Sequence, residues 1–175
     1  MTATFRYKIT VIGDGSVGKT SLINRFVSNK FQESYQETVG IDMFNHDLVI
    51  DEKEIVEISL LIYDLGGQQY WKSLRSSFYQ QSRGLILVFD VNNPESFHSL
   101  ADWYKEAIEN IGYTVPTIIL GNKSDLEKKV SNKLLNSPFI KNLSPEIYFT
   151  SAKTGNMVNK AFKEISTQIY RRYNS

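Results

Sequence analysis

The stretch that decides the fold of this chain reads Gly13-Asp14-Gly15-Ser16-Val17-Gly18-Lys19-Thr20. It fits the pattern G-x-x-x-x-G-K-[ST], which is the phosphate-binding P-loop. Residues 7–12 before it have the composition of a strand, and residues 21–27 after it have the apolar spacing of a helix. An ordinary glycine turn is the alternative, but it requires neither the Gly-Lys-Thr ending nor these two flanks. The stretch therefore predicts a phosphate site at a strand-to-helix turn.

The chemistry of such a loop is the capture of an oxyanion. Glycines let successive backbone N–H groups turn inward, and the following helix directs the positive end of its dipole to the same point. Lys19 adds a positive charge for the β- and γ-phosphates and is a candidate catalytic residue, while the Thr20 hydroxyl can bind Mg²⁺. The residues expected to surround the phosphates are Gly15, Ser16, Val17, Gly18, Lys19, Thr20 and Ser21.

Length and composition point to one soluble domain. The 175 residues fit a single domain over 1–175, and 41% hydrophobic with 22% charged residues is ordinary for a soluble protein. A net charge of +1 gives no bulk attraction to nucleic acid or a membrane, and the lack of cysteine excludes disulfides. No apolar run approaches the length of a membrane span. We expect a cytoplasmic monomer that binds no nucleic acid and has no membrane anchor in this chain.

A second phosphate-side signal follows a predicted hairpin. Strands at 41–50 and 55–63 are joined by a short charged turn, which predicts an antiparallel edge pair. Directly after them comes Asp64-Leu65-Gly66-Gly67-Gln68. A carboxylate at a strand end can hold Mg²⁺, and the N–H of Gly67 can meet a terminal phosphate. An ordinary strand-ending turn is the alternative, but the preceding P-loop favours the functional interpretation.

The rest of the chain alternates strands and helices. Apolar runs at 84–91, 116–120 and 147–150 predict buried parallel strands. Helices are predicted from the Asn93-Pro94 pair to about residue 111 and over about 156–170. Residues 126–145 are the least readable: Ser131 can cap a short helix, and Pro138 is expected to break it. The alternation predicts an α/β fold.

A base-reading loop follows the strand at 116–120. It reads Gly121-Asn122-Lys123-Ser124-Asp125. The two oxygens of Asp125 suit the N1–H and N2–H₂ donors of guanine, and adenine offers no such pair. Asn122 can tie neighbouring loops together, and the stem of Lys123 can cover a face of the base.

Together these residues resemble the Ras-like small GTPase superfamily. The resemblance covers nearly the whole chain, and the Rab branch looks nearest because of 74–79, 88–91 and 93–97. It implies a single three-layer P-loop NTPase domain with a six-stranded, mostly parallel sheet, one antiparallel edge strand and about five helices on both faces. The motifs that carry it, in order, are Gly13-x4-Gly18-Lys19-Thr20, Thr38, Asp64-x-x-Gly67-Gln68, Asn122-Lys123-x-Asp125 and Ser151-Ala152-Lys153.

The resemblance also implies a role for single residues. Phe31 packs edge-on against guanine, Tyr35 and Thr38 belong to the first switch, and Thr38 joins Thr20 and Asp64 at Mg²⁺ in the GTP state. Gln68 is the catalytic residue that orients the attacking water.

Beyond these positions, the loop of Ser151, Ala152 and Lys153 supports the base, with Asn122, Lys123 and Asp125 reading it. Effector, exchange-factor and activating proteins are expected to bind through residues 32–42 and 65–80.

The chain departs from the Rab pattern at several places. Gly66 stands where alanine is usual, which resembles the Arf and heterotrimeric Gα pattern and is expected to loosen the second switch. Gln69 replaces an acidic residue, which puts exchange-factor recognition in doubt. The hairpin is a few residues longer than usual, and the prenylated C-terminal cysteines of Rabs are missing.

The rate of hydrolysis is expected to be low. Gα proteins carry a catalytic arginine two residues before the switch threonine, where this chain has Gln36, and no arginine lies between Asn29 and Asp64. We expect an intrinsic rate on the order of 10⁻⁴ to 10⁻³ s⁻¹, with small Gly15 leaving room for an arginine from a partner. The alternatives are a GTP-binding interaction module with negligible hydrolysis and, less in keeping with Asp125, a P-loop ATPase or nucleotide kinase.

Overall fold

A central sheet organises the computed structural model, which describes residues 4–34, 36–52 and 55–174. The six strands lie in the order β2-β3-β1-β4-β5-β6. β2 pairs antiparallel with β3, and every other neighbouring pair is parallel. This confirms the mostly parallel sheet with one antiparallel edge strand. The strands are β1 (Thr4–Ile12), β2 (Ile41–Asp51), β3 (Ile55–Leu65), β4 (Gly84–Asp90), β5 (Thr117–Asn122) and β6 (Glu146–Phe149).

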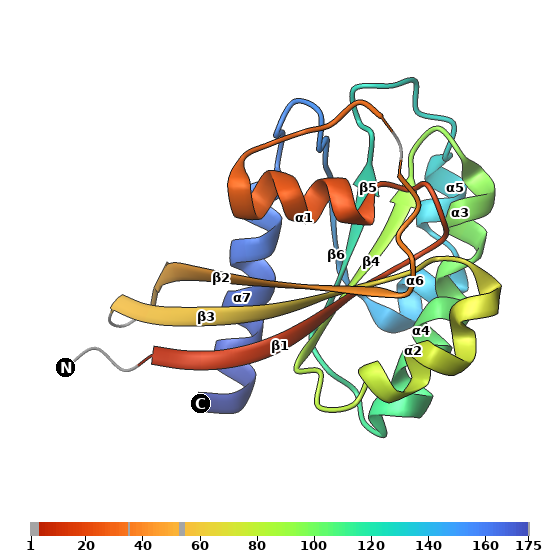
Figure 1. Ribbon diagram of the computed structural model, residues 1–175. Coiled ribbons are helices and arrows are strands. Elements are labelled where there is room, and N and C mark those ends of the chain that lie inside the picture. Colours follow the sequence, from red (N-terminus) through yellow and green to blue (C-terminus); the bar gives the residue numbers. More distant parts are fainter. Residues whose placement is uncertain (1–3, 35, 53–54, 175) are drawn as a thin grey trace.

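Helices cover both faces of the sheet. Figure 1 shows α1 and α7 on one side and α2 to α6 on the other, and the two hydrophobic cores divide in the same way. The structure is therefore three-layered. α3 and α4 follow one another around Ser99, and α5 and α6 are short, so the helices form five regions of the described chain. They are α1 (Lys19–Ser28), η1 (Gln69–Trp71), α2 (Lys72–Phe78), α3 (Pro94–His98), α4 (Leu100–Ile111), α5 (Asn132–Leu135), α6 (Pro138–Leu143) and α7 (Val158–Asn174).

The hydrophobic pattern of the sequence correctly predicts which side chains of β3 and β4 are buried. β4 is buried along its whole length, as its continuous apolar run predicts. In β3, Val56, Ile58, Leu60 and Ile62 are buried, which confirms the alternation. None of the helices in the described part of the chain is long and apolar enough to cross a membrane.

The prediction for Pro138 was wrong in its effect. Ser131 caps α5 as expected, because its side chain accepts a hydrogen bond from the N–H of Leu134. α5 ends at Leu135, however, and Pro138 opens the new helix α6 instead of breaking the first one. A proline is favoured at the first position of a helix, since that N–H has no intrahelical partner.

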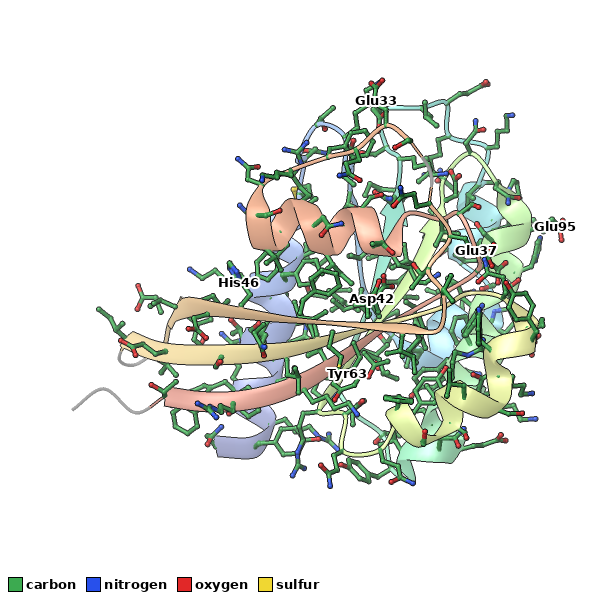
Figure 2. The ribbon with its side chains drawn as sticks, in the orientation of Figure 1. Glu33, Glu37, Asp42, His46, Tyr63 and Glu95 are labelled. Atoms are coloured by element: carbon green, nitrogen blue, oxygen red, sulfur yellow. The ribbon has the colours of Figure 1, made fainter. Side chains whose placement is uncertain are left out.

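The parallel strands bring the predicted motifs to one edge. The P-loop follows β1, Asp64 lies near the end of β3, Asn122 ends β5, and Ser151 follows β6. Because the carboxyl ends of parallel strands share one edge of a sheet, the loops after them converge there. Figure 2 shows the side chains at this edge, with Glu33 at its outer end in the connection between α1 and β2.

Candidate nucleotide-binding site

The converging loops enclose a cavity of about 470 Å³. Its walls come from the P-loop, the α1–β2 connection, the start of the segment after β3, and the loops after β5 and β6. A cavity of this size fits a nucleotide-sized ligand. The predicted site residues that line it are Gly15, Ser16, Gly18, Lys19, Thr20, Ser21, Phe31, Thr38, Gly67, Gln68, Asn122, Lys123, Asp125, Ala152 and Lys153.

Some predicted site residues do not reach the wall of the cavity. Val17, Asp64 and Ser151 are buried behind it. Asp64 and Ser151 act on the lining through hydrogen bonds to Thr20 and Asp125. Tyr35 lies outside the described residues. The cavity also has lining residues that the motifs do not include: Asn24, Ser28, Lys30, Gln32, Glu33, Ser34, Gln36 and Leu126.

Lys19 is held at the P-loop end of the cavity. Its side chain is buried, and its Nζ donates to the carbonyl oxygens of Gly13 and Asp14, both at 2.8 Å. Burial lowers the pKa of Lys19 to about 8, while the nearby carboxylate of Asp64 opposes that shift. Gly18 precedes α1 and has a left-handed backbone conformation, with φ +95°. The P-loop therefore turns directly into the helix, and the first N–H groups of α1, which have no partner within the helix, face the cavity.

Oxygen atoms of Thr20, Thr38 and Asp64 meet beside Lys19. The two threonine hydroxyls are 2.8 Å apart, and Thr20 donates to Oδ2 of Asp64. Oδ1 of Asp64 is buried and has no hydrogen-bond partner among the described residues. Burial raises the pKa of Asp64 to about 6, with Lys19 acting in the opposite direction. An orphaned carboxylate oxygen beside two hydroxyls is a hard donor set that fits Mg²⁺.

The described residues contain no group of three or more His, Cys, Asp or Glu side chains that could hold a metal ion. This agrees with the oxygen set above, in which two of the donors are threonines. Mg²⁺ at these three side chains would need non-protein oxygens to complete its coordination, as is usual where Mg²⁺ is bound together with phosphates.

Asn122 ties the loop after β5 to its neighbours, as the sequence predicts. Its Nδ2 donates to the carbonyl of Val17 at 3.0 Å, and its Oδ1 accepts from the N–H of Ala152 at 3.2 Å. Asp125 lies at the exposed end of the cavity, where its Oδ1 accepts from the hydroxyl of Ser151 at 2.6 Å. The carboxylate is thus oriented by a side chain from the next loop.

Lys123 adopts a left-handed backbone conformation with φ +64°. Its ammonium pairs with Asp90 Oδ2 at 2.7 Å, at the end of β4. This pair fixes the head of the side chain, so the aliphatic stem lies along the wall of the cavity.

Gly67 and Gln68 lie directly over the P-loop. A Cβ on Gly67 would come within 2.4 Å of the backbone nitrogen of Gly15, so no other residue allows this close approach. Nε2 of Gln68 lies 3.1 Å from the point where Gly15 would carry a Cβ. The Gln68 amide therefore lies on the side of Gly15 that lacks a Cβ. That small Gly15 leaves space for an incoming arginine stays a prediction.

Comparison with known proteins agrees with this geometry. The Ras family model matches residues 8–171. The chain belongs to the Ras family. It is 36% identical to the Ras-related protein Rab-9A of Rattus norvegicus over 168 residues, covering 93% of this chain and 82% of the relative. It is 37% identical to Rab-9A of Homo sapiens over 163 residues, covering 90% and 80%. These relatives support the resemblance to the Rab branch, and the chain is a small GTPase.

This Ras-family protein also has a site residue that the motifs do not reveal. Arg25, on α1, donates through Nε to the carbonyl of Ala152 at 2.7 Å and through Nη2 to that of Lys153 at 2.7 Å. Arg25 therefore anchors the loop after β6 to the helix that follows the P-loop. No local pattern could have predicted it, because the partners are 127 residues apart in sequence.

In this Ras-family protein the two predicted switch segments contact one another. The N–H of Gly66 donates to the carbonyl of Gly40 at 2.9 Å, and Tyr70 donates to Glu37. Gly66 is buried, and an added Cβ would lie 2.9 Å from Cδ1 of Trp71 and 3.1 Å from the carbonyl oxygen of Thr38. Gly66 is therefore closely packed in this arrangement of the two segments. The expected loosening of the second switch stays a prediction.

Proposed function

We propose that this small GTPase is a molecular switch that binds GTP or GDP with Mg²⁺ and slowly hydrolyses GTP to GDP and phosphate. The observation that carries the proposal is the position of Gln68, whose amide lies over Gly15 in the same cavity that Thr20 and Thr38 line. A phosphoryl group in the cavity would then have Lys19 and the helix N-terminus on one side and Gln68 on the other.

Each group in the cavity has a separate task in this reaction. Lys19 and the backbone N–H groups of the P-loop neutralise charge on the β- and γ-phosphates. Thr20, Thr38 and Asp64 would hold Mg²⁺, which would supply charge neutralisation for the phosphates. Gln68 orients the attacking water through its side-chain amide.

Guanine specificity rests on Asp125. Its carboxylate is exposed at the end of the cavity and oriented by Ser151, so it can accept from both the N1–H and N2–H₂ groups of guanine. Adenine would leave these acceptors without donors, and a site built for such hydrogen bonds rejects the wrong base strongly.

A slow rate of GTP hydrolysis is expected because the cations among the described lining residues are all lysines. They are Lys19, Lys30, Lys123 and Lys153, and Gln36 lies at the position where Gα proteins have arginine. Without an arginine at the γ-phosphate, the rate is expected to stay on the order of 10⁻⁴ to 10⁻³ s⁻¹. An activating protein would supply the missing charge.

The switch acts through the contact between residues 32–42 and 65–80. Thr38 and Gly67 line the cavity, where they would meet the γ-phosphate, and Gly66 and Tyr70 join the two segments behind them. Loss of the γ-phosphate would release both segments. Val39 in the first segment and Met43 directly after it are 75% and 61% exposed, and apolar side chains at such a surface suit protein partners.

The proposal is tested by nucleotide competition and single-turnover hydrolysis. Excess unlabelled GTP should displace fluorescent GDP, while the same excess of ATP should not; equal displacement would exclude a guanine site. The protein loaded with GTP and Mg²⁺ should release phosphate at about the rate given above, and Gln68→Leu should slow it at least about tenfold. If Gln68→Leu leaves the rate unchanged, a GTP-binding interaction module is the better description.

A further inference from the structure

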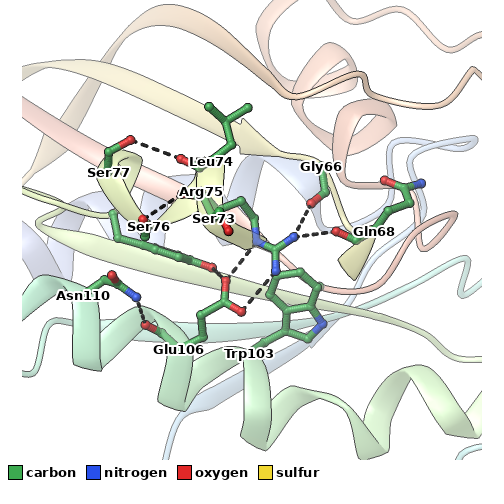
Figure 3. Close-up of polar contacts among 12 residues, drawn as sticks. Gly66, Gln68, Ser73, Leu74, Arg75, Ser76, Ser77, Trp103, Glu106 and Asn110 are labelled. Atoms are coloured by element: carbon green, nitrogen blue, oxygen red, sulfur yellow. Dashed lines mark hydrogen bonds and ion pairs between the residues drawn. The ribbon is translucent and has the colours of Figure 1, made fainter. Parts of the chain in front are cut away.

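A fully buried arginine lies within the second switch segment. Arg75, on α2, has 0% of its side chain exposed. Its Nη1 donates to the carbonyl of Gly66 at 3.1 Å and to that of Gln68 at 2.7 Å, as Figure 3 shows. A guanidinium is always charged, so its burial requires a counter-charge and a complete set of acceptors.

Glu106 on α4 supplies that counter-charge. Nε of Arg75 lies 2.9 Å from Oε1 of Glu106 and Nη2 lies 3.1 Å from Oε2, a two-point contact that fixes the plane of the guanidinium. Tyr79 also donates to Glu106 Oε1, at 2.8 Å, and burial beside this carboxylate raises the pKa of Tyr79 so that its hydroxyl remains a donor.

Trp103 on α4 completes the support and extends it to the P-loop. The guanidinium carbon of Arg75 lies 4.4 Å from the centre of the Trp103 ring, a cation–π distance. The indole N–H of Trp103 donates to Oδ1 of Asp14 at 2.7 Å, and the Ser99 hydroxyl donates to Oδ2 of Asp14 at 2.8 Å. One side of α4 thus contacts both the phosphate loop and the arginine that holds Gln68.

We propose that Arg75 is a positioning residue for Gln68, with Glu106 and Trp103 holding Arg75 in place. Arg75 fixes the main-chain carbonyls on both sides of Gly67, and this sets the direction in which the Gln68 side chain leaves the backbone. The proposal rests on the hydrolytic function proposed above. It places the control of water orientation in α4, outside the cavity.

The test compares hydrolysis in single and double variants. Arg75→Met should slow single-turnover GTP hydrolysis about 10- to 100-fold, because a small displacement of a catalytic group has a cost of this order. Affinity for GDP should stay within about twofold, since the P-loop and Asp125 determine it. In a Gln68→Leu background, Arg75→Met should change the rate by less than about twofold, because Arg75 acts only through Gln68.

Arg75→Lys is the second variant, for the case that Arg75→Met does not fold. It keeps the charge and most of the volume of the side chain but cannot form the two-point contacts. It should slow hydrolysis in the same selective way. Arg83→Met is the matched control, because Arg83 also stacks on a ring, that of Tyr173, at 4.6 Å. It should leave the rate unchanged.

Different results overturn different proposals. If Gln68→Leu slows hydrolysis but neither Arg75 variant does, or if Arg75 variants slow it equally in the Gln68→Leu background, the positioning role is wrong. If Gln68→Leu itself has no effect, the proposed catalytic function fails first.

Discussion

Replacing Gly66 with alanine tests whether close packing or flexibility requires the glycine. A methyl group at this position would lie 2.9 Å from Cδ1 of Trp71, 3.0 Å from the carbonyl oxygen of Gly40 and 3.1 Å from that of Thr38. Two of these neighbours are main-chain atoms of the first switch segment and cannot rotate away. Alanine would therefore have to push the two switch segments apart by a few tenths of an ångström.

Two opposing effects determine the sign of the change. Alanine reduces the conformational freedom of the unfolded chain, which stabilises a protein by about 0.4–1 kcal/mol. Overpacking at a buried contact costs about 1–3 kcal/mol. We therefore expect Gly66→Ala to lower the free energy of unfolding by about 1 kcal/mol, which corresponds to a fall in melting temperature of about 2–4 °C for a domain of this size.

The assay is thermal unfolding at saturating nucleotide, with equal concentrations of a non-hydrolysable GTP analogue or of GDP. The loss should be larger with the GTP analogue, because the methyl group meets Thr38 and Gly40 only when the switch segments are closed. In a Trp71→Leu background the loss should shrink, since the nearest contact is gone. A higher melting temperature of Gly66→Ala in both nucleotide states would refute the packing argument and restore the flexibility interpretation.

The remaining predictions concern the base, the loop anchor and the metal. Asp125→Asn should weaken GTP binding by about 100-fold without improving ATP binding, because hydrogen bonds to a charged group contribute about 1.5–3 kcal/mol each; calorimetric titration measures this. Arg25→Met should speed GDP dissociation about tenfold, since the carbonyls of Ala152 and Lys153 lose a charged donor; release of fluorescent GDP measures it. Thr20→Val should raise the Mg²⁺ concentration needed for tight GTP binding about 10- to 100-fold, measured by titration with a chelator.

Each of these predictions has its own control. Arg6→Met removes an exposed arginine on β1 and should leave GDP dissociation unchanged; if Arg25→Met behaves like it, the loop needs no anchor. Equal GTP affinity of Asp125→Asn and the unaltered protein would show that the base is read elsewhere. Thr20→Ser keeps a hydroxyl and should retain Mg²⁺ dependence, so an equal loss in Thr20→Ser and Thr20→Val would assign the effect to packing.

Much of the fold could be predicted because its signals are local. The apolar run of β4, the alternation in β3 and the cap at Ser131 all express short-range rules of periodicity and hydrogen bonding. The order of strands and helices followed from these elements together with the family resemblance. Pro138 was misjudged because proline both ends and begins helices, and only the backbone on its two sides decides which.

The sequence by itself carries the signals for the proposed chemistry of the site: a phosphate loop, oxygen donors for Mg²⁺ and a carboxylate for guanine. These rest on short motifs in which residue type and spacing suffice. Only the tertiary structure decided what holds them, because Asp14 meets Trp103 across 89 residues and Arg25 meets Ala152 across 127. The sheet creates these contacts by bringing loops that are far apart in sequence to one edge, and no local spacing in the sequence encodes them. For the same reason Gly66 signals flexibility in the sequence but proves to be closely packed in the folded protein.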